Sequence, residues 1–90
     1  MNIGTVNISG RFVLAPMTAV NCTAFRMLCK ENKASLIYTQ MIDVDFIKNK
    51  NKSEIKEFLN INEFERPVSV QLIGNNEESL MRSIKLVEDF

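Results

Sequence analysis

The sequence contains no histidine, which removes the commonest general base and the commonest metal ligand of proteins. It has only two cysteines, Cys22 and Cys29, and their spacing fits no common zinc pattern. We therefore expect no metal site, and we expect both thiols to be reduced in a cytosolic protein.

Net charge and long apolar runs are also missing. Eleven basic and eleven acidic residues give a formal net charge of zero, whereas a free-standing nucleic-acid binder usually carries a basic excess. No apolar run approaches the roughly 20 residues that span a bilayer. The N-terminus has no basic start followed by a long apolar region, which argues against a secretory signal. These absences predict a cytoplasmic protein without membrane contact.

What is present fits one small globular domain, with 46% hydrophobic and 24% charged residues in a chain of 90. Residues 3–9 alternate loosely between apolar and polar types and are flanked by Gly4 and Gly10, which predicts a short strand or hairpin arm. Residues 12–15 are uniformly apolar and end at Pro16. This pattern predicts a strand buried on both faces, as in a parallel sheet.

A helix is predicted next, with Asn21 or Thr23 as its cap. Its apolar positions are Phe25, Leu28 and Cys29. Arg26 falls on the other side of this helix, where an arginine is usually exposed, although an anion contact is the alternative. Residues 36–41 then read as a second buried strand.

The later part of the chain gives one more strand and two helices. A helix is predicted from Ser53 to Leu59, a strand from Val68 to Ile73, and a helix from Glu77 to Phe90. Residues 74–76 form a turn with capping residues before the last helix. The apolar stripe of that helix is predicted at Leu80, Ile84 and Val87, with Met81 and Leu86 beside it.

Strands and helices therefore alternate, with strand starts roughly 25 to 30 residues apart, which predicts an α/β fold with a parallel sheet. A Rossmann-like open sheet and a TIM barrel are the alternatives. No G-x-G-x-x-G motif follows the first strand, which favours the barrel. A complete barrel needs about 250 residues. We therefore predict a partial TIM (β/α)8 barrel, roughly the first three βα units, preceded by a short N-terminal strand or hairpin.

Four blocks of residues resemble the N-terminal third of tRNA-dihydrouridine synthases in order and spacing. They are Leu14-Ala15-Pro16-Met17, Phe25-Arg26 with Leu28-Cys29, Tyr38-Thr39-Gln40-Met41, and Glu65-Arg66-Pro67-Val68-Ser69-Val70-Gln71-Leu72-Ile73-Gly74. The resemblance covers nearly the whole chain. It implies that residues 1–90 are the incomplete N-terminal portion of an FMN-binding TIM-barrel domain.

The resemblance also implies a reaction, in which the C5=C6 bond of selected uridines in tRNA is reduced. Bound FMN passes a hydride to C6, and NAD(P)H reloads the flavin. By the same resemblance, Pro16, Met17 and Thr18 lie along the flavin, and Gln71 hydrogen-bonds its ring. Met17, Met41 and Gln71 also lie at or near the carboxyl ends of predicted strands. Barrel active sites form at these ends, so this placement supports the flavin site independently of the resemblance.

Plainer interpretations of the same residues stay open. Pro16 and Met17 can be a strand terminator and a core methionine, and Gln71 can be a polar residue of an edge strand. The run from Lys48 to Lys52 can contact tRNA phosphate, or it can be a solvated loop balanced by Glu54 and Glu57.

Two departures from the family pattern bear on activity. Gln40 stands where the family usually has glutamate, in its Thr-Glu-Met pattern. The catalytic cysteine belongs to a later Gly-Cys-Pro motif, and neither Cys22 nor Cys29 matches it. We therefore expect this chain alone to be inactive. Because three βα units leave an open sheet edge and unburied apolar helix faces, we also expect it to self-associate. The alternatives are a non-catalytic fragment or partial barrel that needs a partner chain, and another flavin barrel resembling dihydroorotate dehydrogenase.

Overall fold

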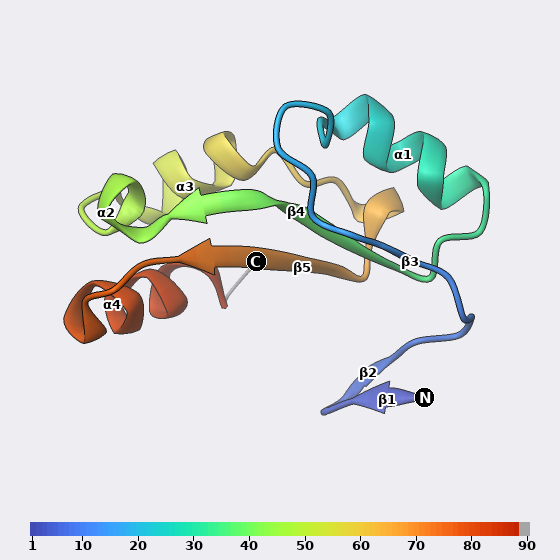
Figure 1. Cartoon of the computed structure of the whole chain (residues 1–90), viewed down its shortest axis with the longest axis horizontal. Coiled ribbons are helices and arrows are strands. Elements are labelled where there is room, and N and C mark those ends of the chain that lie inside the picture. Colours follow the sequence, from blue (N-terminus) through green and yellow to red (C-terminus); the bar gives the residue numbers. More distant parts are fainter. Residues whose placement is uncertain (89–90) are drawn as a thin grey trace.

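The computed structural model describes residues 1–88 and shows a small parallel sheet, four helices and an N-terminal hairpin (Figure 1). In chain order the elements are β1 (Asn2–Ile3), β2 (Val6–Asn7), β3 (Val13–Leu14), α1 (Thr23–Glu31), β4 (Leu36–Asp43), α2 (Val44–Ile47), α3 (Lys52–Leu59), the 3-10 turn η1 (Glu63–Glu65), β5 (Val68–Ile73) and α4 (Glu77–Val87). The predicted α/β alternation and the predicted N-terminal hairpin are both confirmed.

The sheet has three strands in the order β3-β4-β5, and both strand pairs are parallel, as the sequence predicts. The register of β4 against β5 shifts once. Tyr38 pairs with Ser69 and Met41 pairs with Gln71, so Thr39 and Gln40 together oppose a single residue of β5. This β-bulge reverses which side of the sheet each later residue of β4 faces.

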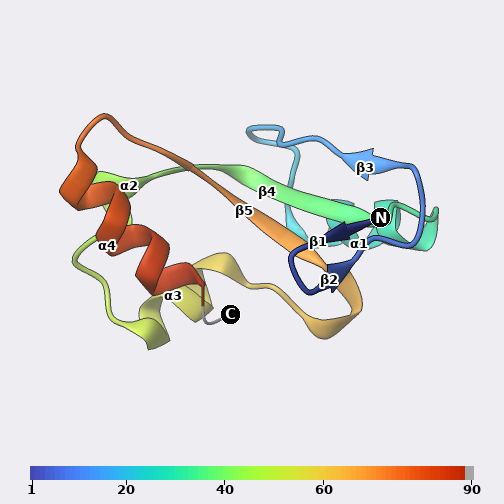
Figure 2. The ribbon, with the colours of Figure 1, turned by 90° about the horizontal axis from the view of Figure 1, so that it is seen from below.

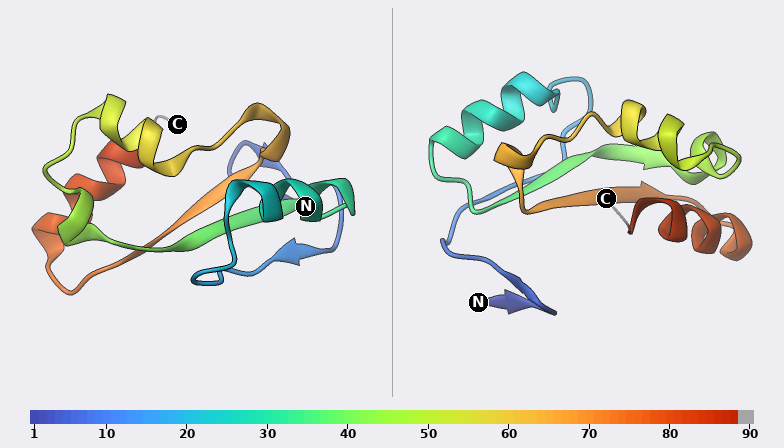
Figure 3. Two further views of the ribbon diagram at one scale, coloured as in Figure 1. Left: turned by 90° about the horizontal axis from the view of Figure 1, so that it is seen from above. Right: turned by 180° about the vertical axis from the view of Figure 1, so that it is seen from behind.

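The main hydrophobic core lies on one side of β4 and β5. Its buried residues are Ile42, Ile47, Ile55 and Leu59, with Val70, Leu72, Leu86 and Val87 packed against them. These residues come from both strands and from α2, α3 and α4, so all three helices contact the same side of the sheet. Figures 1 and 3 show α1 on the same side of the sheet as α3, over the other end of the strands, with the hairpin on the opposite side.

Side-chain caps fix where two of the helices begin. The Asn51 side chain accepts a hydrogen bond from the Glu54 amide while the Glu54 carboxylate accepts one from the Asn51 amide, so α3 starts one residue earlier than predicted. The Asn76 side chain accepts from the Ser79 amide, which confirms the predicted capping turn before α4. α2 and η1 were not predicted from the sequence.

The prediction that residues 12–15 form a strand buried on both faces is wrong. β3 is only two residues long, and Phe12 and Val13 are 72% and 46% exposed. β5, the other outer strand of the sheet, is also only half-buried. The physical reason is the same for both, since β3 and β5 are the edge strands of this sheet, and only β4 has a strand on each side.

Two helix faces also differ from the prediction. Cys22, rather than Asn21 or Thr23, is the N-cap of α1, and the helix buries Arg26 while Leu28 is 54% exposed. In α4 the buried residues are Ser79 and Ser83, which leaves Met81 and Ile84 exposed. Residues 89–90 of the predicted last helix lie outside the described residues.

Candidate functional site

The side of the sheet opposite the helices, which we call the open face, carries Gln71 near its carboxyl end. Gln71 alternates along β5 with Val70 and Leu72, which pack into the core, so its side chain belongs to the open face. It is half-buried, and its carboxamide has no hydrogen-bond partner among residues 1–88. Met41, its register partner on β4, is 46% exposed. An amide with free donors and an acceptor beside a soft apolar side chain can bind a planar ring with mixed polar edges.

The β-bulge in β4 positions this pair of residues. Thr39 is 3% exposed, and its hydroxyl accepts a hydrogen bond from the Gln71 amide at 3.2 Å and donates one to the Gln40 carbonyl at 2.9 Å. The hydroxyl therefore replaces the ladder partner that the bulge removes. Because of the bulge, Met41 rather than Gln40 shares the open face with Gln71.

The segment Pro16–Thr18 follows β3 directly. Pro16 and Met17 are half-buried and Thr18 is exposed. β4 lies between β3 and β5, so this segment and Gln71 come from strands that are not neighbours. In parallel strands both positions lie toward the carboxyl edge of the sheet, but no hydrogen bond within residues 1–88 joins them.

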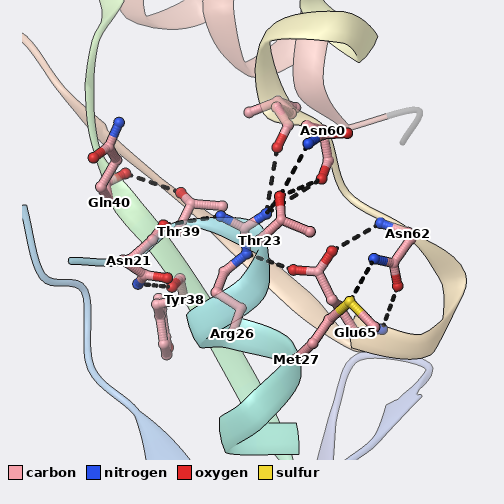
Figure 4. A network of polar contacts seen from close by, with 11 residues as sticks. Asn21, Thr23, Arg26, Met27, Tyr38, Thr39, Gln40, Asn60, Asn62 and Glu65 are labelled. Carbon is pink, nitrogen blue, oxygen red and sulfur yellow. Dashed lines mark hydrogen bonds and ion pairs between the residues drawn. The ribbon is translucent and has the colours of Figure 1, made fainter. Parts of the chain in front are cut away.

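Behind the sheet, Arg26 and Glu65 form a buried ion pair that the sequence patterns missed (Figure 4). The Arg26 Nε atom lies 2.5 Å from Glu65 Oε1, and the two residues are 5% and 0% exposed. Arg26 Nη1 also donates to the Asn21 carbonyl at 3.0 Å, and its Nη2 donates to the Asn60 carbonyl at 3.3 Å. Such a pair tolerates burial only because these additional bonds satisfy its remaining donors.

Neighbouring amides complete the polar cluster around this pair. The second Glu65 carboxylate oxygen accepts from the Asn62 amide at 2.9 Å, and Asn60 Nδ2 donates to the Thr23 hydroxyl at 3.1 Å. The cluster therefore ties the start of α1 to the chain that leaves α3. Asn21 Nδ2 donates to the Tyr38 carbonyl, and this bond holds the loop after Pro16–Thr18 against β4.

A polar cavity of about 250 Å³ adjoins this cluster. Asn21 Oδ1 is buried there without a hydrogen-bond partner in the described part of the chain. A buried acceptor beside a roomy polar cavity is the usual place of an ordered water molecule. None of the four predicted flavin residues lines this cavity.

A larger cavity of about 600 Å³ separates the hairpin from the amino end of the open face. Ile3, Val6 and Ile8 line one side of it, and Leu36 and Tyr38 of β4 line the other. Figure 2 shows β1 and β2 across this end of the sheet. The hairpin thus covers the amino end of the open face, away from Gln71.

The remaining chemical groups give little further indication of a site. Within residues 1–88, no group of three His, Cys, Asp or Glu side chains is arranged to hold a metal ion. Cys22 and Cys29 are both free thiols. No helix in this same range is long and apolar enough to cross a membrane.

Comparison with known proteins gives a family match. Residues 13–90 match the family described as dihydrouridine synthase. A probable tRNA-dihydrouridine synthase of Aquifex aeolicus is 33% identical over 75 residues, which is 82% of this chain and 23% of that protein. A tRNA-dihydrouridine(16/17) synthase [NAD(P)(+)]-like protein of Rattus norvegicus is 28% identical over 81 residues, which is 89% of this chain and 18% of that protein. The chain thus spans less than a quarter of either relative's length. No solved structure matches it significantly.

Proposed function

The chain belongs to the dihydrouridine synthase family, and on this premise we propose that residues 1–90 are the N-terminal portion of the FMN-binding TIM barrel of a tRNA-dihydrouridine synthase. The sheet supports a barrel because its strands follow chain order and the core helices lie on one side. A doubly wound sheet would carry helices on both sides. In a barrel, the open face would be the interior and the hairpin would close its amino end.

The observation that carries the flavin proposal is the free carboxamide of Gln71 on the open face. It would hydrogen-bond the flavin ring, and Pro16, Met17 and Thr18 would lie along it from the end of β3. All four positions lie toward the carboxyl edge of the sheet, where barrel enzymes bind their cofactors. FMN, when bound, would supply the hydride that reduces the C5=C6 bond of a uridine in tRNA, with NAD(P)H as the reductant.

Within this proposal, the chain's own residues position the cofactor and carry no proton to the base. Neither Cys22, at the cap of α1, nor Cys29, within that helix, takes the part of the catalytic cysteine. The chain alone would therefore be inactive. A tRNA substrate also fits the cytoplasmic location expected from the sequence.

Two rival functions can be compared with the family match and with the exposed apolar surface. The family match favours a dihydrouridine synthase over a flavin barrel that resembles dihydroorotate dehydrogenase. A partial barrel completed by a partner chain has some support from the exposed apolar residues of the open face, where Met41 and Ile73 are each 46% exposed.

The flavin proposal is tested by the FMN content of the gene product purified from its source cell. Gln71→Leu should lower FMN affinity about tenfold, because it removes one hydrogen bond from a partly buried site. Asn49→Leu, which removes an exposed amide from the α2–α3 loop, is the matched control and should retain FMN. Equal FMN retention by both variants would exclude Gln71 from the flavin site.

A further inference from the structure

A strongly basic groove lies between the loop after α2 and the helix α4. The groove has a volume of about 470 Å³ and is lined by Lys48, Lys50, Lys52, Arg82, Lys85, Leu86 and Glu88. Five of the eleven basic residues of the chain thus line one hollow, and Glu88 is the single acidic residue that lines it within the described range 1–88. Positive charge is therefore concentrated in this groove although the net charge of the chain is zero.

Four cations of this groove, Lys48, Lys50, Arg82 and Lys85, remain available to a ligand. Lys48 pairs with Asp45 at 3.2 Å, but the two side chains are 33% and 60% exposed, and such a pair contributes little. Lys50 Nζ lies 4.7 Å from the centre of the Phe46 ring, which is a cation–π contact and not an ion pair. Arg82 and Lys85 have no ion-pair partner within residues 1–88.

Glu54, one of the two acidic residues expected to balance the lysine run, caps α3 by accepting a hydrogen bond from the Asn51 amide. Arg82 and Lys85 lie three residues apart on α4, so they project from the same side of the helix. Both sides of the groove are therefore basic.

We propose that this groove is a docking surface for the phosphate backbone of RNA. Concave basic surfaces attract a linear polyanion because each neutralised phosphate releases counterions. A membrane surface fits less well, since Leu86 is the only apolar residue among those of 1–88 that line the hollow. Naming the RNA as tRNA rests on the proposed function.

The position of the groove relates it to the carboxyl edge of the sheet. Lys48 Nζ lies 3.5 Å from the Ser79 hydroxyl in the first turn of α4, and α4 follows the carboxyl end of β5. Figure 2 shows the α2–α3 loop running beside α4 away from that edge. RNA in the groove would therefore extend along the outer side of the helices from the edge that carries Gln71.

The test measures binding of the 90-residue chain to a fluorescent, unmodified tRNA transcript by anisotropy, from about 50 to about 200 mM salt. Arg82→Gln/Lys85→Gln should weaken binding about tenfold and lower the salt slope by about two, one for each lost phosphate contact. Both residues are exposed, so the fold should be unaffected.

The matched control is Arg11→Gln/Lys33→Gln, which removes the same charge from two exposed residues near the amino ends of β3 and β4. It should retain wild-type affinity. Equal weakening by both variants, or no binding of tRNA by the wild-type chain, would overturn the proposal. Binding to anionic phospholipid vesicles without binding to tRNA would also overturn it and would assign the groove to a membrane. None of these outcomes depends on flavin, so the FMN experiment judges the proposed function separately.

Discussion

Arg26 is the residue whose removal should harm the fold most. Arg26→Gln would leave the fully buried Glu65 carboxylate without its cation, and breaking a buried pair in this way costs about 3–5 kcal/mol. Arg66→Gln is the matched control, because it breaks the Arg66–Glu63 pair, whose side chains are 39% and 90% exposed. That change should cost less than about 1 kcal/mol. Urea unfolding compares the two, and similar losses would contradict the structural role of the buried pair.

Thr39 should act through its hydroxyl rather than its shape. Thr39→Val keeps the volume but leaves the Gln71 amide and the Gln40 carbonyl without their partner, which should cost about 1–3 kcal/mol. Thr39→Ser keeps the hydroxyl and should be the more stable variant. Thermal unfolding of the two variants measures the difference. A valine variant as stable as the serine variant would show that the bulge needs no hydroxyl.

The sequence predicted where some of these residues lie on their strands, and it misplaced Arg26 for a physical reason. Gln71 and Met41 were expected near strand ends, and the register places them side by side. Arg26 was expected on the exposed side of its helix, because helical periodicity compares only near neighbours. Its partner Glu65 lies 39 residues away, so no local pattern could have shown the pair. Two of the resemblance blocks do contain these residues, and that is the signal that could have linked them.

At the scale of elements, Gly74, which directly follows β5, lies close to the first residue of α2, Val44. A Cβ atom at this position would lie 2.3 Å from Val44 Cγ2, and Val44 is fully buried. Gly74→Ala should therefore push the strand end away from α2 and cost about 1–3 kcal/mol. Asn75→Ala, at the exposed neighbouring position, should cost less. Chemical unfolding of both variants checks this, and an unchanged midpoint for Gly74→Ala would disprove the close contact.

At the same scale, the element order could be predicted but several details could not. The caps of α3 and α4 involve neighbouring residues, so local sequence contains their signal. The burial of β3 depends on how many strands flank it, which the four apolar residues at 12–15 cannot specify. The bulge at Thr39 likewise depends on pairing with β5, which begins 29 residues later.

At the scale of the whole molecule, the three-stranded sheet leaves one edge of β3 and one edge of β5 unpaired within residues 1–88. Its open face also carries exposed apolar residues such as Ile73. The isolated 90-residue chain should therefore associate, with a sedimentation coefficient that rises with concentration. Ile73→Lys on the open face should reduce this association, whereas Met81→Lys on α4, a residue that is similarly exposed, should not. A monomer with a sharp, concentration-independent unfolding transition would contradict this expectation.

We propose that this chain forms part of an enzyme that makes dihydrouridine in tRNA. Position-by-position mapping of dihydrouridine in tRNA from the source cell, with and without the gene, tests this proposal. We predict that deletion removes dihydrouridine from at least one position and that the intact gene restores it. An unchanged dihydrouridine pattern after deletion, in cells with no second gene of the family, would contradict the account.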